Sequence, residues 1–260
     1  MVVSELSIAV VKGTRLVHPG ALRIGPGGAE DDRRFHVVAA GGRQEGAPRR
    51  ALTLVRAGWD ADARRLTLRF PDGGAVDGTA ELGGPAVARV TWDCGRPVDG
   101  REVLGPWSQA RSAYLGEPVV LAEAAAPRRA IDVAPVTLVS AASVERLEVA
   151  LGASGIGARR FRMTMLLDGL QAHEEDRWYG RALTAGGCRL RVTGPVPRCA
   201  VVTRDPDTAR RDHAALRAIV GYRPPVELAD GSVVKAPFGV YAEVEEPGTV
   251  RAGDRVVVDG

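Results

Sequence analysis

The residues best suited to chemistry lie at Cys199, which follows the short run Gly194-Pro195-Val196-Pro197-Arg198. Proline fixes φ and lacks a backbone donor, so this run predicts a stiff turn that presents the thiol at a set angle. The neighbouring Arg198 guanidinium favours thiolate over thiol, and the thiolate is the form that attacks electrophiles or binds a soft metal. The spacing therefore predicts a reactive or metal-ligating cysteine, against the alternative of a buried, inert thiol.

The remaining cysteines and histidines do not form a second centre in the sequence. The three cysteines are widely spaced, with no C-x-x-C pair and no ligand set for zinc or an iron–sulfur cluster. Reduced thiols in a reducing compartment fit this pattern best. Cys188 lies in an alternating run and is predicted to be structural, whereas Cys94 gives no signal.

Composition excludes several classes of partner. The 260-residue chain has a net charge of +3, with 26% charged and 45% hydrophobic residues, as soluble globular proteins do. Arginines are spread among acids, so no nucleic-acid partner is expected. No apolar run approaches the roughly 18 residues of a membrane helix, so we expect no membrane contact and a cytoplasmic location. Lys12 and Lys235 are the only lysines, which weakly marks each as a position where an ammonium matters.

The elements that must position Cys199 are mostly strands. In the first half, short β-branched or alternating runs are separated by glycine- and aspartate-rich turns, and a helix is predicted over residues 105–115. The expected strands cover residues 4–11, 35–39, 51–55, 65–70, 87–92 and 118–122. The segment 124–129 breaks this rhythm and is the predicted domain boundary.

In the second half, Ser140 is predicted to cap a helix that extends to about residue 151, and a short amphipathic helix is expected over residues 212–220. The expected strands cover residues 136–139, 162–167, 182–184, 189–193, 200–203, 237–243 and 254–258. The predicted fold class is mostly β (α+β), with an N-terminal barrel-like domain at 1–125 and a second β-barrel domain with a few short helices at 126–260.

Ordered motifs in the second half resemble the MOSC domain, the C-terminal domain of molybdenum cofactor sulfurase. In chain order these are Asp132-x-x-Pro135, Ser140-Ala141-Ala142-Ser143, Arg160-Phe161-Arg162, Glu175-Asp176-x-Trp178-x-Gly180, Pro197-Arg198-Cys199, Asp205-Pro206-Asp207-Thr208, Phe238-Gly239-Val240-Tyr241 and Pro247-Gly248-Thr249-Val250-x-x-Gly253-Asp254. The first half resembles the β-barrel domain that precedes MOSC in many members. Its matching motifs are Val10-Val11-Lys12, Asp32-Arg33-Arg34-Phe35, Arg43-Gln44, Pro48-Arg49 and Trp107-Ser108 with Leu115-Gly116-x-Pro118-Val119.

The resemblance implies a molybdenum cofactor held between two domains, as in the amidoxime-reducing components and their bacterial relatives, which reduce N-hydroxylated compounds. It implies that Cys199 is the metal ligand and the catalytic residue. A phosphate needs cations, and Lys12 and Arg33 match the family positions for it. An ion pair of Arg33 with Asp31 or Asp32 is the alternative for that residue. The other residues matched to cofactor contacts are Arg162, Thr164, Arg198 and Asp205, with turn formation as the alternative for Asp205.

Two departures from the family pattern keep other functions open. Gly13 stands where the family often has serine, and Met163-Thr164 stands where it often has Pro-Asn, so Thr164 replaces only part of an asparagine's hydrogen bonding. A persulfide on Cys199, loaded by a cysteine desulfurase, is the first alternative, and a cofactor carrier is the second. The reductase function requires a small-molecule substrate and an external flavoprotein or ferredoxin-type electron donor, since no ferredoxin-like cysteine pattern follows.

Overall fold

The computed structural model describes residues 1–39, 50–91, 97–126 and 129–259. Two compact units make up the chain. The barrel unit comprises Met1–Ile8, His18–Glu30 and Ala134–Gly260, and the sheet unit comprises Ala9–Val17 and Asp31–Val133. The barrel unit thus takes its first strand from the N-terminus, and the division of the chain at residue 125 stays a prediction. The predicted fold class, mostly β with a few short helices, is confirmed.

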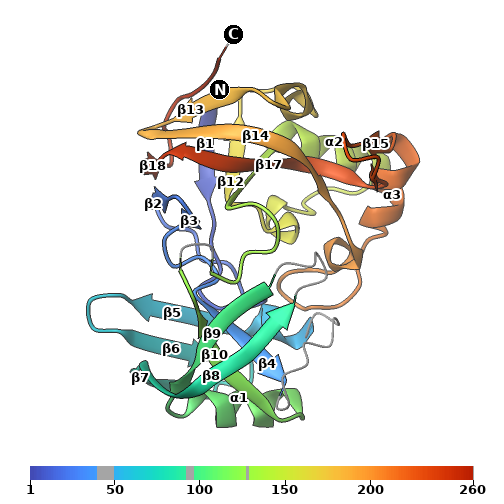
Figure 1. Ribbon diagram of the computed structural model, residues 1–260. Coiled ribbons are helices and arrows are strands. Elements are labelled where there is room, and N and C mark those ends of the chain that lie inside the picture. Colours follow the sequence, from blue (N-terminus) through green and yellow to red (C-terminus); the bar gives the residue numbers. More distant parts are fainter. Residues whose placement is uncertain (40–49, 92–96, 127–128, 260) are drawn as a thin grey trace. The chain divides into compact units, whose positions relative to one another are not determined.

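A seven-stranded sheet forms the barrel unit. Its strands, in spatial order, are β1 (Val2–Leu6), β12 (Met165–Asp168), β11 (Val136–Ser140), β17 (Pro237–Glu246), β14 (Cys188–Pro197), β13 (Ala182–Ala185) and β19 (Val256–Val258). Figure 1 shows β14 and β17 side by side, as their antiparallel pairing requires. The two edges meet because Val3 donates to the Asp254 carbonyl at 2.9 Å and accepts from the Gly253 amide at 2.7 Å. The sheet therefore closes nearly into a barrel.

Alternation explains why β14 forms a wall of this barrel. Cys188, Leu190 and Val192 are fully buried, and the intervening side chains point outward. Cys188 is therefore structural, as predicted, and burial raises the pKa of its thiol to about 11.

The helix α2 (Ala141–Leu151) joins β11 to β12, which are parallel neighbours. Ser140 caps it as predicted, because its Oγ accepts from the Ser143 amide at 3.0 Å, and Gly152 ends it in the left-handed conformation. A second helix, α3 (Ala215–Tyr222), packs on α2. The smaller strands of this unit are β2 (Ala21–Gly25), β3 (Gly28–Ala29), β15 (Val226–Glu227), β16 (Val233–Val234) and β18 (Gly248–Arg251).

The cap gives a direct prediction. Replacing Ser140 with alanine removes the acceptor for the Ser143 amide inside the protein, so the free energy of unfolding should fall by about 1–2 kcal/mol. Urea unfolding measures it. Ser232→Ala, in an exposed turn, is the control and should change stability by less than about 0.5 kcal/mol. An equal loss of unfolding free energy in the two variants would show that the Ser140 cap does not stabilise the protein.

In its described residues, the sheet unit has two antiparallel sheets and one α-helix around a shared core. One sheet has the order β4 (Phe35–Ala39), β10 (Val119–Ala124), β9 (Pro97–Leu104) and β8 (Glu81–Thr91), and the other has β5 (Arg56–Asp60), β6 (Arg65–Arg69) and β7 (Ala75–Thr79). The helix α1 (Trp107–Leu115) buries Trp107 in the core beside residues that include Phe35, Leu66, Leu68 and Leu121.

Two predicted strands are wrong, because the segments are 3₁₀ turns. Residues 51–55 lie mainly in η1 (Arg50–Leu54). Leu52 in this turn and Val55 just after it are both buried, and the Val55 amide donates to the Leu52 carbonyl at 3.0 Å. Burial at a spacing of three matches a 3₁₀ helix. Residues 200–203 form η4 (Ala200–Thr203), in which Val202 alone is buried. The β-branched composition of both runs gave the wrong prediction.

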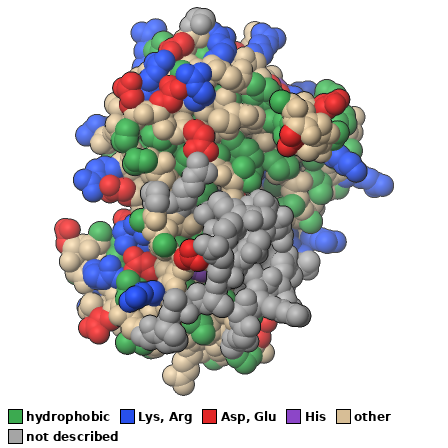
Figure 2. Space-filling view, in the orientation of Figure 1, with side chains coloured by type: hydrophobic (Ala, Val, Ile, Leu, Met, Phe, Trp, Pro, Cys, Tyr) green, Lys and Arg blue, Asp and Glu red, His purple; other side chains and the backbone are tan. Residues whose placement is uncertain are grey.

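The surface agrees with the balanced charge of the sequence. On the face shown in Figure 2, side chains of Lys or Arg and of Asp or Glu are interspersed over the barrel unit. Within the part of the chain that the structure describes, no helix has both the length and the apolar character required to span a membrane.

Candidate functional site

Cys199 is exposed and lies where β14 passes into η4. The predicted turn at Gly194–Pro197 is wrong, since these residues form the last part of β14 and pair with β17. The pairing register shifts between Val192 and Gly194 and again between Pro195 and Pro197. Irregular pairing tolerates prolines, which have no amide to donate. The thiol is therefore presented at the end of a strand.

Arg198, the residue before Cys199, is buried in hydrogen bonds within the barrel unit. Its Nε and Nη2 donate to the Phe238 carbonyl at 2.9 and 2.6 Å, and its Nη1 donates to the Phe161 carbonyl at 2.9 Å. Nη2 also lies 2.7 Å from the Met163 sulfur. Burial lowers the pKa of Arg198 to about 10, and the charges of Tyr241 and Cys199 act in the opposite direction. The predicted cofactor contact of Arg198 stays a prediction, because all three guanidinium nitrogens bond to protein acceptors.

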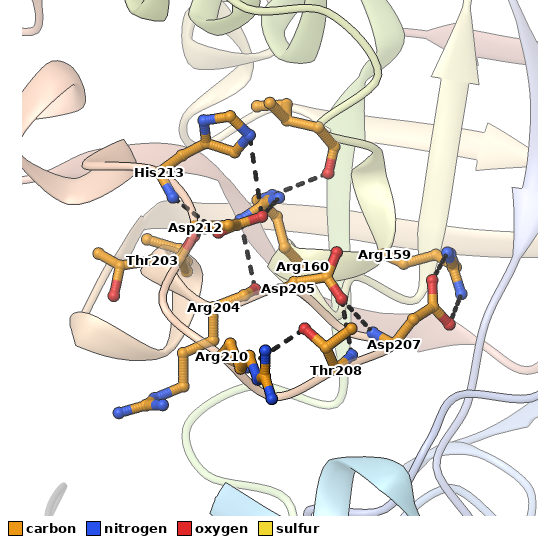
Figure 3. A network of polar contacts seen from close by, with 12 residues as sticks. Arg159, Arg160, Thr203, Arg204, Asp205, Asp207, Thr208, Arg210, Asp212 and His213 are labelled. Atoms are coloured by element: carbon orange, nitrogen blue, oxygen red, sulfur yellow. Dashed lines mark hydrogen bonds and ion pairs between the residues drawn. The ribbon is translucent and has the colours of Figure 1, made fainter.

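The loop that follows η4 is held by a polar network (Figure 3). Asp205 accepts from the amides of Asp207 at 2.9 Å and Thr208 at 2.6 Å, which is the turn-forming arrangement considered from the sequence. Arg159 binds the Asp207 carboxylate through two hydrogen bonds, at 3.1 and 2.5 Å. The loop therefore carries its own carboxylate acceptors and is fixed by them.

Arg162 and Thr164 follow the short η2 (Ala158–Phe161). Arg162 has a φ of 55°, a left-handed conformation that costs a non-glycine residue about 1 kcal/mol. Thr164 is buried, and its hydroxyl lies 3.2 Å from that of Thr137 and accepts from the Thr137 amide at 3.2 Å. The side chain of Thr164 is thus engaged within the barrel, and its predicted cofactor contact stays a prediction.

In the sheet unit, the structure brings Lys12 and Arg33 together. The Lys12 amide donates to the Phe35 carbonyl at 2.7 Å, and the Lys12 Nζ donates to the Ala130 carbonyl at 2.9 Å and to Asp132 at 2.5 Å. Burial lowers the pKa of Lys12 to about 8, with Asp132 acting against that shift and Arg33 adding to it. The backbone brings the two segments together, because the Arg33 amide donates to the Ala9 carbonyl at 2.7 Å and the Phe35 amide donates to the Val10 carbonyl at 3.1 Å.

Arg33 also has a left-handed backbone, with a φ of 49°. Its guanidinium pairs with the buried carboxylate of Asp32, as the ion-pair alternative anticipated. Gly13, where the family often has serine, has a φ of 88°, so the local backbone itself favours glycine there. This departure thus has a conformational reason.

A buried polar cluster was missed by sequence reasoning. Glu175 is fully buried, and its Oε1 accepts from the Ser143 hydroxyl at 2.8 Å and from the Ser140 amide at 3.2 Å. Burial raises the pKa of Glu175. The His173 ring packs on Tyr222 and Phe238, and burial, followed by two nearby arginines, lowers its pKa to about 4. The only sequence signal was the Glu175-Asp176-x-Trp178 motif, in which Trp178 is buried as core.

Some expected parts of the site lie outside the described residues, namely Arg43-Gln44, Pro48-Arg49 and Cys94. Within the described ranges, no group of three or more His, Cys, Asp or Glu side chains could hold a metal ion.

Comparison with known proteins agrees with the sequence motifs. A family model described as the MOSC domain matches residues 126–257. Mitochondrial amidoxime reducing component 2 of Rattus norvegicus is 34% identical over 131 residues, which cover 48% of this chain and 37% of that protein. Molybdenum cofactor sulfurase of Homo sapiens is 28% identical over 82 residues, which cover 32% of this chain and 8% of that protein. The chain therefore spans well under half the length of these relatives.

A solved structure of similar length is the YUAD protein from Bacillus subtilis. It has 13% sequence identity and a TM-score of 0.48, with 98% of this chain and 93% of that chain covered.

Proposed function

Because the chain belongs to the MOSC domain family, we propose that it binds a molybdenum cofactor with Cys199 as a metal ligand and reduces N-hydroxylated compounds. The observation that carries the proposal is the exposed Cys199 thiol at the end of β14. Arg198 fixes the chain before it through the Phe161 carbonyl, and Arg160 fixes the chain after it through the Val202 carbonyl. The names of the amidoxime reducing components support the substrate class.

The residues present fit such a cofactor in their donor chemistry. A thiolate is a suitable ligand for a soft metal centre, and the cations Lys12 and Arg33 suit a phosphate. Arg162 offers a further guanidinium at a strained position, of the kind that functional sites often retain. When bound, the cofactor would supply two-electron chemistry at an N–O bond, converting N–OH to N–H and water with two protons.

The chain's own residues then have separate tasks. Cys199 ligates the metal, Lys12 and Arg33 hold the phosphate, and Arg162 contacts the phosphate or pterin. Arg198 and Asp205 fix the backbone on either side of Cys199. The two electrons require an external flavoprotein or ferredoxin-type donor.

Metal analysis tests the proposal. Protein purified from a molybdenum-replete host should contain molybdenum and pterin in amounts close to one per chain, and should reduce a simple amidoxime with an artificial electron donor. Absence of stoichiometric molybdenum and pterin would contradict the proposal. Bound cofactor without turnover would instead indicate a carrier.

Sulfur transfer is the second candidate, favoured by the exposed Cys199 and by Thr164, whose hydroxyl is engaged with Thr137. In that reaction the Cys199 thiolate attacks a desulfurase persulfide, takes its outer sulfur and releases the desulfurase thiolate. Incubation with a cysteine desulfurase and cysteine should then add about 32 Da to the Cys199 peptide. No such addition is expected if the chain is a reductase alone.

The proposed phosphate contact predicts a pH dependence. Lys12 loses its proton as pH rises through about 8, so affinity for a dianion should fall above that pH. Sulfate keeps its charge throughout, and calorimetry should find its binding about threefold to tenfold weaker at pH 9.5 than at pH 7. Lys12→Arg should bind sulfate equally at both pH values, because the guanidinium stays charged.

The stability contribution of Lys12 has the opposite sign. Its pKa in the folded protein, about 8, lies below its ordinary value of 10.5. Between these values the unfolded chain binds more protons, so this group makes stability rise with pH. A loss of sulfate affinity over the same range therefore cannot result from unfolding linked to Lys12. Identical pH profiles for wild type and Lys12→Arg would contradict the assignment of Lys12.

A further inference from the structure

One short element, η2, makes contacts on both sides of Cys199. On the upstream side, the Phe161 carbonyl of η2 accepts from Arg198 at 2.9 Å, and the Arg198 amide donates to the Ala236 carbonyl at 3.0 Å. Phe161 also stacks on Phe238 with 4.4 Å between ring centroids. The residue before Cys199 is thus fixed by backbone, side-chain and aromatic contacts.

On the downstream side, the neighbouring Arg160 of η2 makes the contacts. Its side chain is 1% exposed. Nη1 donates to the Val202 carbonyl at 3.0 Å and to the Arg204 carbonyl at 3.2 Å, which are acceptors at the end of η4. A 3₁₀ turn leaves such carbonyls without partners inside the turn, and a cation there stabilises it.

The same guanidinium also fixes the loop beyond η4. Nη1 and Nη2 bind the two oxygens of Asp212 at 3.2 and 2.9 Å, and Nε donates to the Ile156 carbonyl at 2.8 Å. Figure 3 shows Arg160 directed at Asp212, with Arg204 and Asp205 on the same loop. Arg160 therefore joins η2, the end of η4 and the start of the segment before α3.

Within the described part of the chain, Cys199 has no side-chain hydrogen bond that would orient its sulfur. The direction of the thiol then depends on its backbone, where the Cys199 carbonyl accepts from the Val202 amide at 3.3 Å. We propose that Arg160 is a positioning residue that sets the direction of the Cys199 thiol by holding η4. The inference rests on the proposed function only in taking Cys199 as the functional thiol.

Arginine is required for this task because its acceptors lie in several directions. Five N–H donors in a planar fork reach one carboxylate and three carbonyls, whereas lysine has three donors at a single point. Arg160→Lys keeps the charge beside Asp212 and loses most of the carbonyl contacts. Arg159→Lys is the matched control, because Arg159 is the preceding residue and pairs with Asp207 in the same loop at an exposed position.

A spin label on Cys199 measures the order of this segment without any cofactor. The Cys94→Ser substitution removes one competing thiol, and Cys188 is buried, so the label reacts with Cys199. Arg160→Lys should shorten the rotational correlation time of the nitroxide about threefold, and Arg159→Lys should leave it unchanged. In unlabelled protein, molybdenum per chain should fall about tenfold in Arg160→Lys and remain in Arg159→Lys.

The two readouts separate the two proposals. A more mobile label in a preparation whose wild type holds no molybdenum would support the positioning role and contradict the reductase. An unchanged label and full molybdenum content in Arg160→Lys would overturn the positioning role alone. If Arg160→Lys does not fold, Asp212→Asn takes its place. Asp212 is exposed, and its replacement removes the charge that pairs with the Arg160 guanidinium. A label as immobile in Asp212→Asn as in the wild type would overturn the inference.

Discussion

Cys199→Ser is expected to purify as a folded protein that lacks molybdenum and does not reduce amidoximes. Serine offers a hard, weakly acidic hydroxyl in place of the thiolate that a soft metal centre prefers. The molybdenum content per chain should fall at least about tenfold, and turnover with an artificial donor should disappear. Because the side chain is exposed, the free energy of unfolding should change by less than about 0.5 kcal/mol.

Cys188→Ala is the control for this experiment. Cys188 is fully buried in the barrel wall, so its truncation should cost about 1–2 kcal/mol while molybdenum is retained. The pair of variants thus gives opposite patterns: one loses the metal and keeps its stability, and the other loses stability and keeps the metal. Molybdenum retained in Cys199→Ser would remove Cys199 from the coordination sphere.

The sequence predicted the parts of the fold that local interactions determine. The strand at 35–39 and the cap at Ser140 agree with the structure because the β-branched and aromatic composition of the strand and the capping contact both act over a few residues. Closure of the barrel was not predictable in this way. It depends on pairing between Val3 and Asp254, at opposite ends of the chain.

The misassigned strand at residues 200–203 shows how a distant contact overrides local composition. Local composition favoured an extended conformation at residues 200–203, but the carbonyls of Val202 and Arg204 bond to Arg160, more than 40 residues away in sequence. For the same reason the sequence identified Cys199 as a candidate residue and gave no role to Arg160. Residue type revealed the chemistry, and distant contacts determine the geometry.

Backbone conformation was also invisible in the sequence. Arg33 and Arg162 were identified by their charge and their place in the family motifs, and both have a positive φ that most residues avoid. Because strained backbone often occurs at functional sites, the positive φ of both residues adds support to a functional role that charge alone supports less strongly.

Gly248→Ala is expected to lower the free energy of unfolding more than the other substitutions proposed above. Gly248 begins β18, directly beside the β13–β14 turn, where the Gly187 amide donates to the Thr249 carbonyl at 2.9 Å. A Cβ at Gly248 would lie 1.9 Å from the Gly187 carbonyl oxygen and 2.4 Å from the Gly187 carbonyl carbon. Both atoms belong to the backbone, so no side chain can move aside.

The strands must separate to admit the methyl group, which breaks the hydrogen bond between Gly187 and Thr249. Overpacking and an orphaned amide together should lower the free energy of unfolding by about 3–5 kcal/mol, measured by urea denaturation. Gly20→Ala is the control, because a Cβ there meets nothing within 4 Å, and it should change stability by less than about 1 kcal/mol. A similar small change in Gly248→Ala would mean that β18 lies farther from the β13–β14 turn. The Pro247-Gly248-Thr249-Val250 motif would then need another explanation than close backbone packing.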